Sequence, residues 1–196
     1  MRTKKNFWLV LGSFLIMAFT GQSLVAQSYN VDSNASNLKV LGTSNIHDWE
    51  MEAKDFQGSM KAQIEDGQLV QIDGLQFGVV AESLKRGKGG MDKNTYKALD
   101  TDDHQRIIFE LQDVKNIDCT SKTNCKVTTT GYLTIAGTKK LVDLTFDAKV
   151  SGDKVTLSGD KKLKMTDFKV DPPTAMFGTI TTGDDVTVKF KSVFTK

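Results

Sequence analysis

Apolar and polar residues alternate with a period of two along most of this chain. Residues 141–150 show the pattern most clearly, because polar or charged residues separate Val142, Leu144, Phe146, Ala148 and Val150. A strand with this alternation has one apolar face and one polar face. Several such strands in series must bury a common apolar surface, so we expect a sheet that folds onto itself or closes into a barrel.

Short turn sequences separate the predicted strands. Asp66-Gly67, Ser151-Gly152-Asp153 and Thr182-Gly183-Asp184 are typical of turns. Strands that follow one another this closely favour an antiparallel meander over βαβ units. The predicted strands are residues 38–43, 49–53, 56–64, 69–80, 107–111, 127–135, 141–150, 155–159 and 186–190.

The strand at residues 69–80 changes phase part-way along. Val70 and Ile72 share one parity, Phe77 has the other, and Asp73-Gly74 lies at the change. We therefore expect a bulge or sharp bend at Asp73-Gly74, which is how strands turn the corner of a barrel.

One helix is predicted among the strands, at residues 91–99. Met91, Thr95, Ala98 and Leu99 recur there at helical spacing, after a glycine-rich segment. Such an apolar stripe suits either a plug that faces the core or a lid, and the sequence leaves both open. A second turn or short helix is expected at residues 165–168.

The start of the chain has the layout of a secretory signal peptide. Three basic residues precede an apolar run at residues 7–19, and Ala26 follows as a small residue at the cleavage point. The run is shorter than the roughly 20 residues of a membrane-spanning helix. We therefore expect residues 1–26 to be removed and the protein to be periplasmic or secreted.

The charge of the remaining chain is close to neutral. Residues 1–26 hold three of the 26 basic residues and no acidic residue, so 23 basic residues face 24 acidic ones in residues 27–196. Because nucleic-acid binding needs a basic surface, this balance argues against DNA or RNA as a partner. With no linker or repeat in it, the segment of residues 27–196 is expected to form one domain.

Cys119 and Cys125 are the only cysteines, and they flank a polar, turn-like stretch. In an exported protein, the simplest interpretation is a disulfide that closes a hairpin. The alternative, a redox or metal-binding pair, is less favoured because the spacing is not C-x-x-C and no histidine lies nearby to complete a zinc site. No metal or cofactor site is predicted.

Catalytic signals are weak. His47-Asp48 resembles a general-base pair, but adjacent residues of a strand point to opposite faces. His104 lies in a polar stretch, and no metalloprotease, nucleophile-elbow or phosphate-loop motif occurs. The basic run with Lys85, Arg86 and Lys88 is either an ordinary solvated loop or, at a barrel mouth, a contact for a phosphate headgroup.

Four segments carry longer motifs. They are residues 43–49 (TSNIHDW), 91–109 (MDKNTYKALDTDDHQRIIF), 131–140 (GYLTIAGTKK) and 167–190 (DFKVDPPTAMFGTITTGDDVTVKF). Together, and in this order, they resemble the motifs of the YceI-like family over most of the chain. The resemblance implies an exported, all-β protein with one short helix: a lipocalin-like antiparallel β-barrel of about eight strands, with the helix at the barrel mouth. Members of this family bind polyisoprenoid chains or isoprenoid quinones inside the barrel, and some are dimers, so a homodimer is an open expectation.

An eight-stranded barrel is just wide enough to hold one slender ligand, so the resemblance and the alternation predict the same apolar tunnel. The ligand would be an isoprenoid lipid, and contact with a membrane would be limited to transient lipid exchange. The expected wall consists of Trp49, Phe77, Val79, Phe109, Leu133, Ile135, Phe146 and Val188, with Met91, Tyr96 and Leu99 from the helix and Phe168, Met176 and Phe177 from the C-terminal loop.

Two other functions remain in competition with an isoprenoid carrier or sequestering protein. In the first, the many phenylalanines pack the barrel solid, and the protein acts through its outer surface or as a dimer. In the second, the protein is an enzyme that uses His47 with Asp48, or His104; we rank it last because it rests only on the presence of these residues.

Overall fold

The computed structural model describes residues 26–196. The predicted signal peptide lies outside the described residues, apart from Ala26 at its end. The described chain is mostly strand, with one α-helix and three short 3₁₀ turns. The strands are β1 (Gln27–Val31), β2 (Asn37–Ser44), β3 (Trp49–Ala53), β4 (Phe56–Glu65), β5 (Gln68–Val80), β6 (Arg106–Ser121), β7 (Asn124–Ile135), β8 (Thr138–Ser151), β9 (Lys154–Lys164), β10 (Thr174–Ala175) and β11 (Ile180–Thr195); the helix is α1 (Gly89–Leu99), and the turns are η1 (Ala81–Ser83), η2 (Thr166–Phe168) and η3 (Met176–Gly178).

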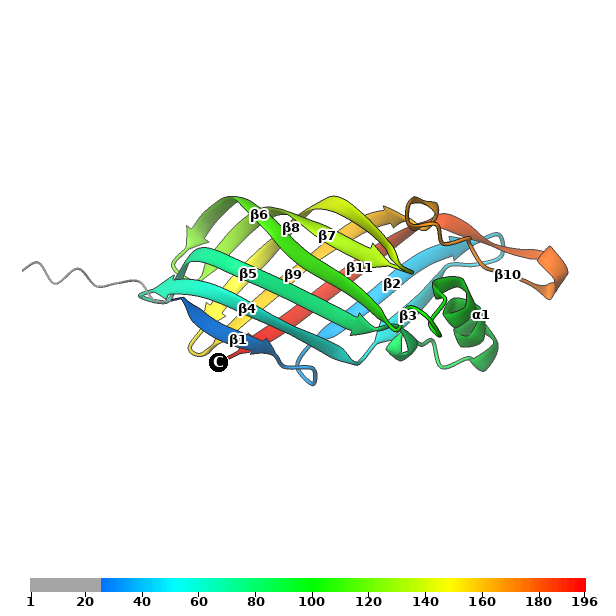
Figure 1. Ribbon diagram of the computed structural model, residues 1–196, viewed down its shortest axis with the longest axis horizontal. Helices are drawn as coiled ribbons and strands as arrows, with labels where there is room; N and C mark the ends of the chain where they lie inside the picture. The colour runs from blue at the N-terminus through cyan, green and yellow to red at the C-terminus, as the bar shows by residue number, and fades with distance from the viewer. Residues whose placement is uncertain (1–25) are drawn as a thin grey trace, which may run out of the picture.

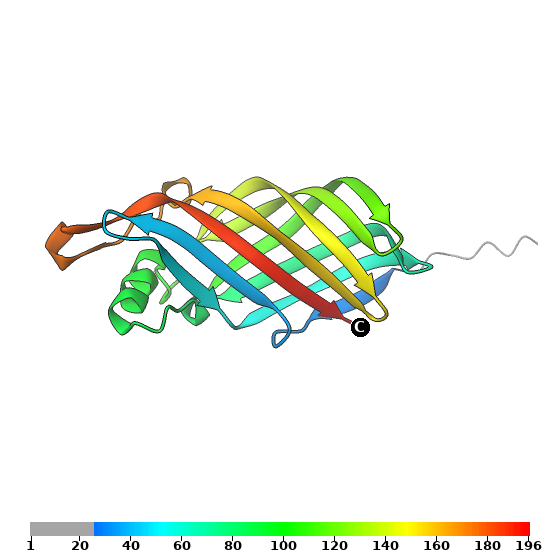
Figure 2. The ribbon, with the colours of Figure 1, turned by 180° about the vertical axis from the view of Figure 1, so that it is seen from behind.

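The strands form an antiparallel barrel (Figures 1 and 2). Each of β4, β5, β6, β7, β8, β9 and β11 pairs with the next, and β1 closes the ring by pairing with β4 on one side and with the end of β11 on the other. The ring therefore passes through eight strands, and β2 and β3 extend the sheet from β11. The predicted fold class, an all-β barrel with one short helix, is confirmed.

The two ends of the barrel differ. Helix α1 and strand β10 lie at one end, and the C-terminus lies at the other (Figure 1). We call these the helix end and the far end. Helix α1 begins after Lys88, carries Asp92 in its first turn, where the helix dipole favours a carboxylate, and ends at Asp100 in the left-handed conformation.

The phase change in β5 is a bulge, as predicted. Lys61 of β4 pairs with Gly74 and the next residue of β4 pairs with Ile72, so Asp73 is the extra residue. A second register shift leaves Val70 unpaired and on the outer face, where it is exposed. The sequence did not predict this second bulge, and it had placed Val70 on the same face as Ile72.

Two of the three predicted turns are present. Asp66 and Gly67 both have positive φ, as a tight two-residue hairpin requires, and Gly152 has positive φ between β8 and β9. The third prediction is wrong, because β11 runs unbroken through Thr182 to Asp184. Gly183 is there for a different reason: a side chain at this position would collide with the hydroxyl of Thr43 on the neighbouring strand.

Apolar side chains fill the interior of the barrel toward the far end. Its core contains Tyr29, Met60, Val127, Val155 and Phe194, all of which are almost completely buried. The predicted disulfide is present near this end, where Cys119 and Cys125 pair across the β6–β7 hairpin. Within residues 26–196, no helix combines the length and apolar character needed to cross a membrane.

Candidate ligand cavity

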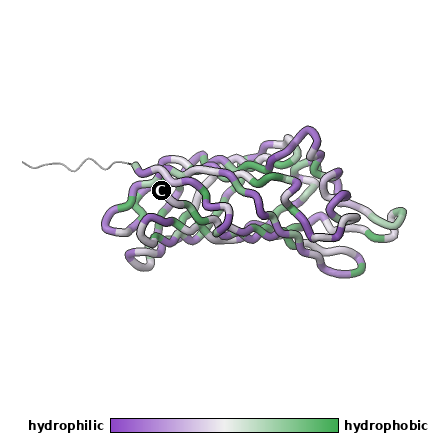
Figure 3. Tube along the Cα trace, turned by 90° about the horizontal axis from the view of Figure 1, so that it is seen from below, coloured by the Kyte–Doolittle hydropathy of each residue, from purple (hydrophilic) through white to green (hydrophobic). Residues whose placement is uncertain are grey.

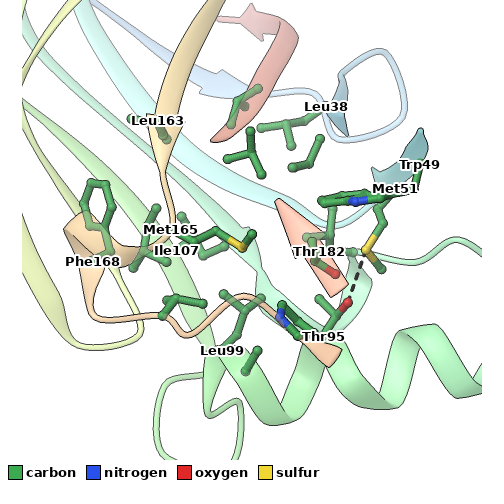
Figure 4. Close-up of a pocket in the computed structure, with 18 of the residues that line it drawn as sticks. Leu38, Trp49, Met51, Thr95, Leu99, Ile107, Leu163, Met165, Phe168 and Thr182 are labelled. Atoms are coloured by element: carbon green, nitrogen blue, oxygen red, sulfur yellow. Dashed lines mark hydrogen bonds between the residues drawn. The ribbon is translucent and has the colours of Figure 1, made fainter. Parts of the chain in front are cut away.

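The helix end of the barrel encloses a cavity of about 1300 Å³. Typical ligand pockets measure roughly 300–1,000 Å³, so this cavity is large for a chain of this size. Its wall is mainly aliphatic and aromatic, and Figure 4 shows side chains from several strands, α1 and the segment after β9 turned toward the same space. The competing hypothesis of a solidly packed barrel interior therefore does not hold at the helix end.

Strand parity explains why the wall is apolar. On β11, Val186, Val188 and Phe190 point into the cavity, while the residues between them point outward. Figure 3 shows the result along the barrel, with hydrophobic and hydrophilic positions following each other along the strands. Because neighbouring strands pair in register, the inward positions of adjacent strands lie side by side and form a continuous apolar surface.

Nearly all of the expected wall residues line this cavity. From the strands these are Trp49, Phe77, Val79, Phe109, Leu133, Ile135, Phe146 and Val188; from α1 they are Met91 and Leu99; from the segment after β9 they are Phe168, Met176 and Phe177. Tyr96 is the exception and does not line it. Its hydroxyl donates a hydrogen bond to the carbonyl oxygen of Glu82, which turns the ring toward η1.

The cavity is a blind pocket. Phe194 and Leu157 line its deepest part, and the solid core lies beyond them. Phe77 stands between the two regions, with its ring 5.6 Å from that of Phe56 and 6.5 Å from that of Phe194. The apolar tunnel expected from the sequence corresponds to this cavity at the helix end of the barrel.

One face of α1 forms part of the wall at the helix end. Met91, Thr95 and Ala98 line the cavity, and the hydroxyl of Thr95 contacts the sulfur of Met51 on β3 at 3.3 Å (Figure 4). The helix therefore borders the cavity and does not fill it. Leu99 of the same helix is buried in the apolar cluster at this end, so the two roles that the sequence left open, a core-facing plug and a lid, both stay open.

Trp49 of β3 also forms part of the cavity wall. Its indole nitrogen donates to the carbonyl oxygen of Thr43 at 2.9 Å, and its ring lies directly over Gly42, its partner in the β2–β3 ladder. A side chain at position 42 would occupy the same space as the ring. The TSNIHDW segment thus fixes an aromatic side chain at the cavity mouth.

The mouth carries an exposed apolar tip, formed by Ile46, Met176 and Phe177. All three side chains are exposed to solvent, and all three border the cavity. Met176 and Phe177 have positive φ in η3, which lies beyond the body of the barrel next to β10 (Figure 1). Asn45 holds this tip together, because its side-chain amide donates to the carbonyl oxygen of Thr179.

The carboxylate of Asp184 holds the segment after β9 in place by hydrogen bonds to Thr166. Asp184 of β11 accepts hydrogen bonds from the backbone N–H and the hydroxyl of Thr166, at 2.8 and 2.7 Å. These two bonds, chiefly the one from the backbone, lower the pKa of Asp184 below its usual value. They fix η2, and with it Phe168, which is buried against the cavity.

The charged residues of the wall are not those expected from the sequence. Lys85, Arg86 and Lys88 do not line the cavity. Lys85 instead extends the sheet by a two-bond bridge to Glu52, and the backbone N–H of Arg86 donates to the buried carboxylate of Asp92. This basic run is therefore a structural connection between β3 and α1. The charged or titratable side chains of the wall are His47, Lys161 and Lys164.

A family model described as the YceI-like domain matches residues 29–194. This chain belongs to the YceI-like family. Among proteins with curated descriptions, none is significantly similar to it in sequence.

Solved structures show the same fold as this YceI-like chain. BcnA of Burkholderia cenocepacia superposes with a TM-score of 0.64 at 20% identity, over 83% of this chain and 98% of BcnA. A polyisoprenoid binding domain from Saccharophagus degradans gives 0.63 at 12% identity, over 85% of this chain and 97% of that domain. The YceI protein of Campylobacter jejuni gives 0.51 at 19% identity, over 74% and 82%.

In the described residues of this YceI-like chain, neither histidine is hydrogen-bonded to a carboxylate. Nδ1 of His47 lies 3.0 Å from the backbone carbonyl oxygen of Asp48, not from its carboxylate. His104 lies away from the cavity wall, with its ring against Gly137 and its Nε2 3.8 Å from the carboxylate of Asp100. His47 thus contacts its own loop, and His104 packs against the turn between β7 and β8.

Several wall residues were missed from the sequence. Leu38, Val40 and Met51 have the inward parity of strands that were predicted, so the signal for them was available. Leu163 and Met165 were missed because the strand before them was predicted to end at residue 159, whereas β9 continues to Lys164 along β11. Backbone pairing with β11 overrides the weak local alternation there.

Proposed function

We propose that this YceI-like protein holds one isoprenoid chain, a polyprenyl phosphate or an isoprenoid quinone, in its cavity as a carrier or sequestering protein. The observation that carries the proposal is an apolar cavity of about 1300 Å³ that is closed at one end and has no aspartate or glutamate in its wall. The neighbour from Saccharophagus degradans, described as a polyisoprenoid binding domain, supports the same class of ligand. The role needs no chemical step and no cofactor.

The energetics suit a long, flexible hydrocarbon. Each buried CH₂ group contributes about 0.8 kcal/mol, so a chain of several isoprene units gains more than enough to offset the cost of ordering it. Met51, Met91 and Met165 line the wall. Methionine side chains adapt their shape to a slender ligand because they are unbranched and polarisable.

We further propose that the protein acts outside the cytoplasm, after removal of residues 1–26, and exchanges its ligand with a membrane. The apolar tip supports this exchange, because Ile46, Met176 and Phe177 are exposed where the cavity opens. A tip of three side chains is far smaller than the roughly 800 Å² per partner of a stable protein interface, so it suits brief contact with a lipid surface. A homodimer would need another surface.

Extraction of the exported protein tests the proposal. Purified protein should release a prenyl lipid into organic solvent, detected by mass spectrometry, and protein stripped of lipid should take up an added isoprenoid quinone or prenyl phosphate. Binding should raise the thermal midpoint of unfolding, because a ligand that binds only the folded state stabilises it. An empty protein that takes up neither compound would contradict the proposal.

A further inference from the structure

The cavity wall contains one cation without an acidic partner. Lys161 of β9 lies on the same face as Leu157 and Leu163, and it pairs across the ladder with Val188 of β11; all four residues line the cavity. In the described part of the chain, Lys161 forms no ion pair. Lys162, the next residue, lies on the outer face and is exposed.

The other polar groups of the wall are already engaged. Lys164 lies at the mouth, with its ammonium nitrogen 4.0 Å from a carboxylate oxygen of Asp184 and 3.7 Å from one of Asp185. His47 is bonded within its own loop. The lining residues include no aspartate or glutamate, and of the two lysines in the wall only Lys161 has no ion-pair partner within residues 26–196.

The β8–β9 ladder ends before it reaches Lys161. Strand β8 pairs with β9 only between Asp147–Ser151 and Lys154–Ser158, and in residues 26–196 no ladder joins residues 138–146 to residues 159–164. We call this unpaired stretch the seam. Val142 and Leu144 border it from β8, and the ion pair between Lys140 and Asp167 bridges it at the helix end. Lys161 is partly buried and lines the cavity beside the seam.

This arrangement favours an anion at mid-depth in the cavity. An ammonium group against an apolar wall is poorly compensated, and a ligand anion would form a short, charge-assisted hydrogen bond with it. Lysine binds phosphate groups as a point charge, and water at the seam would solvate the remaining phosphate oxygens. Leu157 lies toward the floor and Leu163 toward the mouth, so apolar wall for a hydrocarbon chain exists on both sides of Lys161.

We infer that Lys161 binds the anionic headgroup of the ligand, and that the protein therefore prefers a phosphate or pyrophosphate ester of a prenyl chain to an uncharged prenyl alcohol or quinone. This inference rests on the proposed function and names the ligand class within it. A bound ester would place its phosphate against Lys161 and its chain along Phe190, Val188 and the other apolar wall residues.

Matched ligands and matched variants test the inference. Geranylgeranyl monophosphate and geranylgeraniol share one chain and differ only in the headgroup, and their affinities for lipid-free protein are measured by calorimetry. The native protein should bind the phosphate at least about tenfold more tightly than the alcohol. Lys161→Met, which keeps the apolar stem, should remove most of this preference and leave alcohol binding within about twofold. Lys162→Met is the control and should behave like the native protein.

The outcomes separate the inference from the proposed function. If both ligands bind equally well to the native protein, or if Lys161→Met keeps the preference, Lys161 merely extends to water and the inference is overturned while the carrier function stands. If neither ligand binds, the proposed function fails and the inference fails with it. Inorganic phosphate alone should not bind measurably. If it bound as tightly as the ester, the site would be one for free phosphate and the inference would be wrong.

Discussion

Gly131 shows how single residues shape the cavity wall. It lies on β7 beneath the ring of Phe109 from β6, and a Cβ atom at this position would collide with that ring and with the carbonyl oxygen of Glu110. Neither neighbour can move freely, because Phe109 is buried in the wall and the carbonyl belongs to the backbone.

We expect Gly131→Ala to destabilise the protein by about 1–3 kcal/mol, the usual cost of overpacking, and to push the Phe109 ring into the cavity. Denaturant unfolding measures the first effect, and reduced uptake of an isoprenoid quinone measures the second. Gly74→Ala is the control, since position 74 has open space around it and an ordinary φ. Equal stability of the two variants would contradict this account.

Because of Asp184, the stability of the folded protein should depend on pH in a predictable way. Because hydrogen bonds from Thr166 lower its pKa in the folded protein, the folded state favours the ionised carboxylate more than the unfolded state does. The resulting stabilisation is fully present above the unfolded pKa of about 3.9 and is lost as the pH falls through the lower folded pKa.

We therefore expect Asp184→Asn to lower stability at neutral pH and to flatten the loss of stability in acid. Thermal unfolding across this pH range measures both effects, and Asp185→Asn is the control because Asp185 accepts no hydrogen bond from η2. Identical pH profiles for Asp184→Asn and the native protein would show that the Thr166 contact contributes nothing.

At the scale of elements, the β6–β7 hairpin is held by a covalent bond. Cys119 and Cys125 face each other in the ladder near the far end, beside the buried core of that end. The bond therefore stabilises the fold and has no contact with the ligand wall, since neither cysteine lines the cavity.

Replacing both cysteines by serine should lower the free energy of unfolding by about 2 kcal/mol, the value expected for so short a loop. Urea titration of the double variant measures this loss, and reduction of the native protein by dithiothreitol should reproduce it. Uptake of an isoprenoid quinone should be unchanged. A loss of uptake without a loss of stability would mean that the hairpin reaches the cavity by a route that the structure does not show.

The strands differ in how well their sequences predict bulges and register shifts. The bulge at Asp73 in β5 was predictable, because the inward parity changes there between two well-alternating segments. The register shifts in β6, after Leu111, Val114 and Cys119, were not. Half of that strand is polar on both faces, so the order of residues does not indicate which face is buried, and only pairing with β7 decides it.

For the whole molecule, the barrel has one open end, and the exposed apolar side chains there determine how a ligand enters. Phe177 is the most exposed large apolar residue of the tip, whereas Leu141, which is also exposed, lies outside the cavity wall on β8. A comparison of variants at these two residues therefore shows whether ligand transfer depends on an apolar side chain at the cavity mouth or on any exposed apolar side chain.

We expect Phe177→Ser to slow transfer of an isoprenoid quinone from phospholipid vesicles by about tenfold, because insertion of a phenylalanine side chain into lipid contributes about 1.5–3 kcal/mol. Quenching of a vesicle-embedded fluorophore measures the rate, and Leu141→Ser should leave it unchanged. If both variants slow transfer equally, general surface hydrophobicity and not the apolar tip controls exchange.

The sequence by itself determined the fold class, the inward face of most strands, the disulfide and most of the cavity wall. The physical reason is that side chains on a strand alternate between two faces, so composition at every second position reveals burial. Only the tertiary structure decided that the helix end is hollow and the far end solid, since local parity does not reveal how side chains from opposite walls fill the space between them. It also showed that Lys161, and not Lys85, Arg86 or Lys88, lines the cavity, because backbone pairing with β11 carries β9 beyond its predicted end.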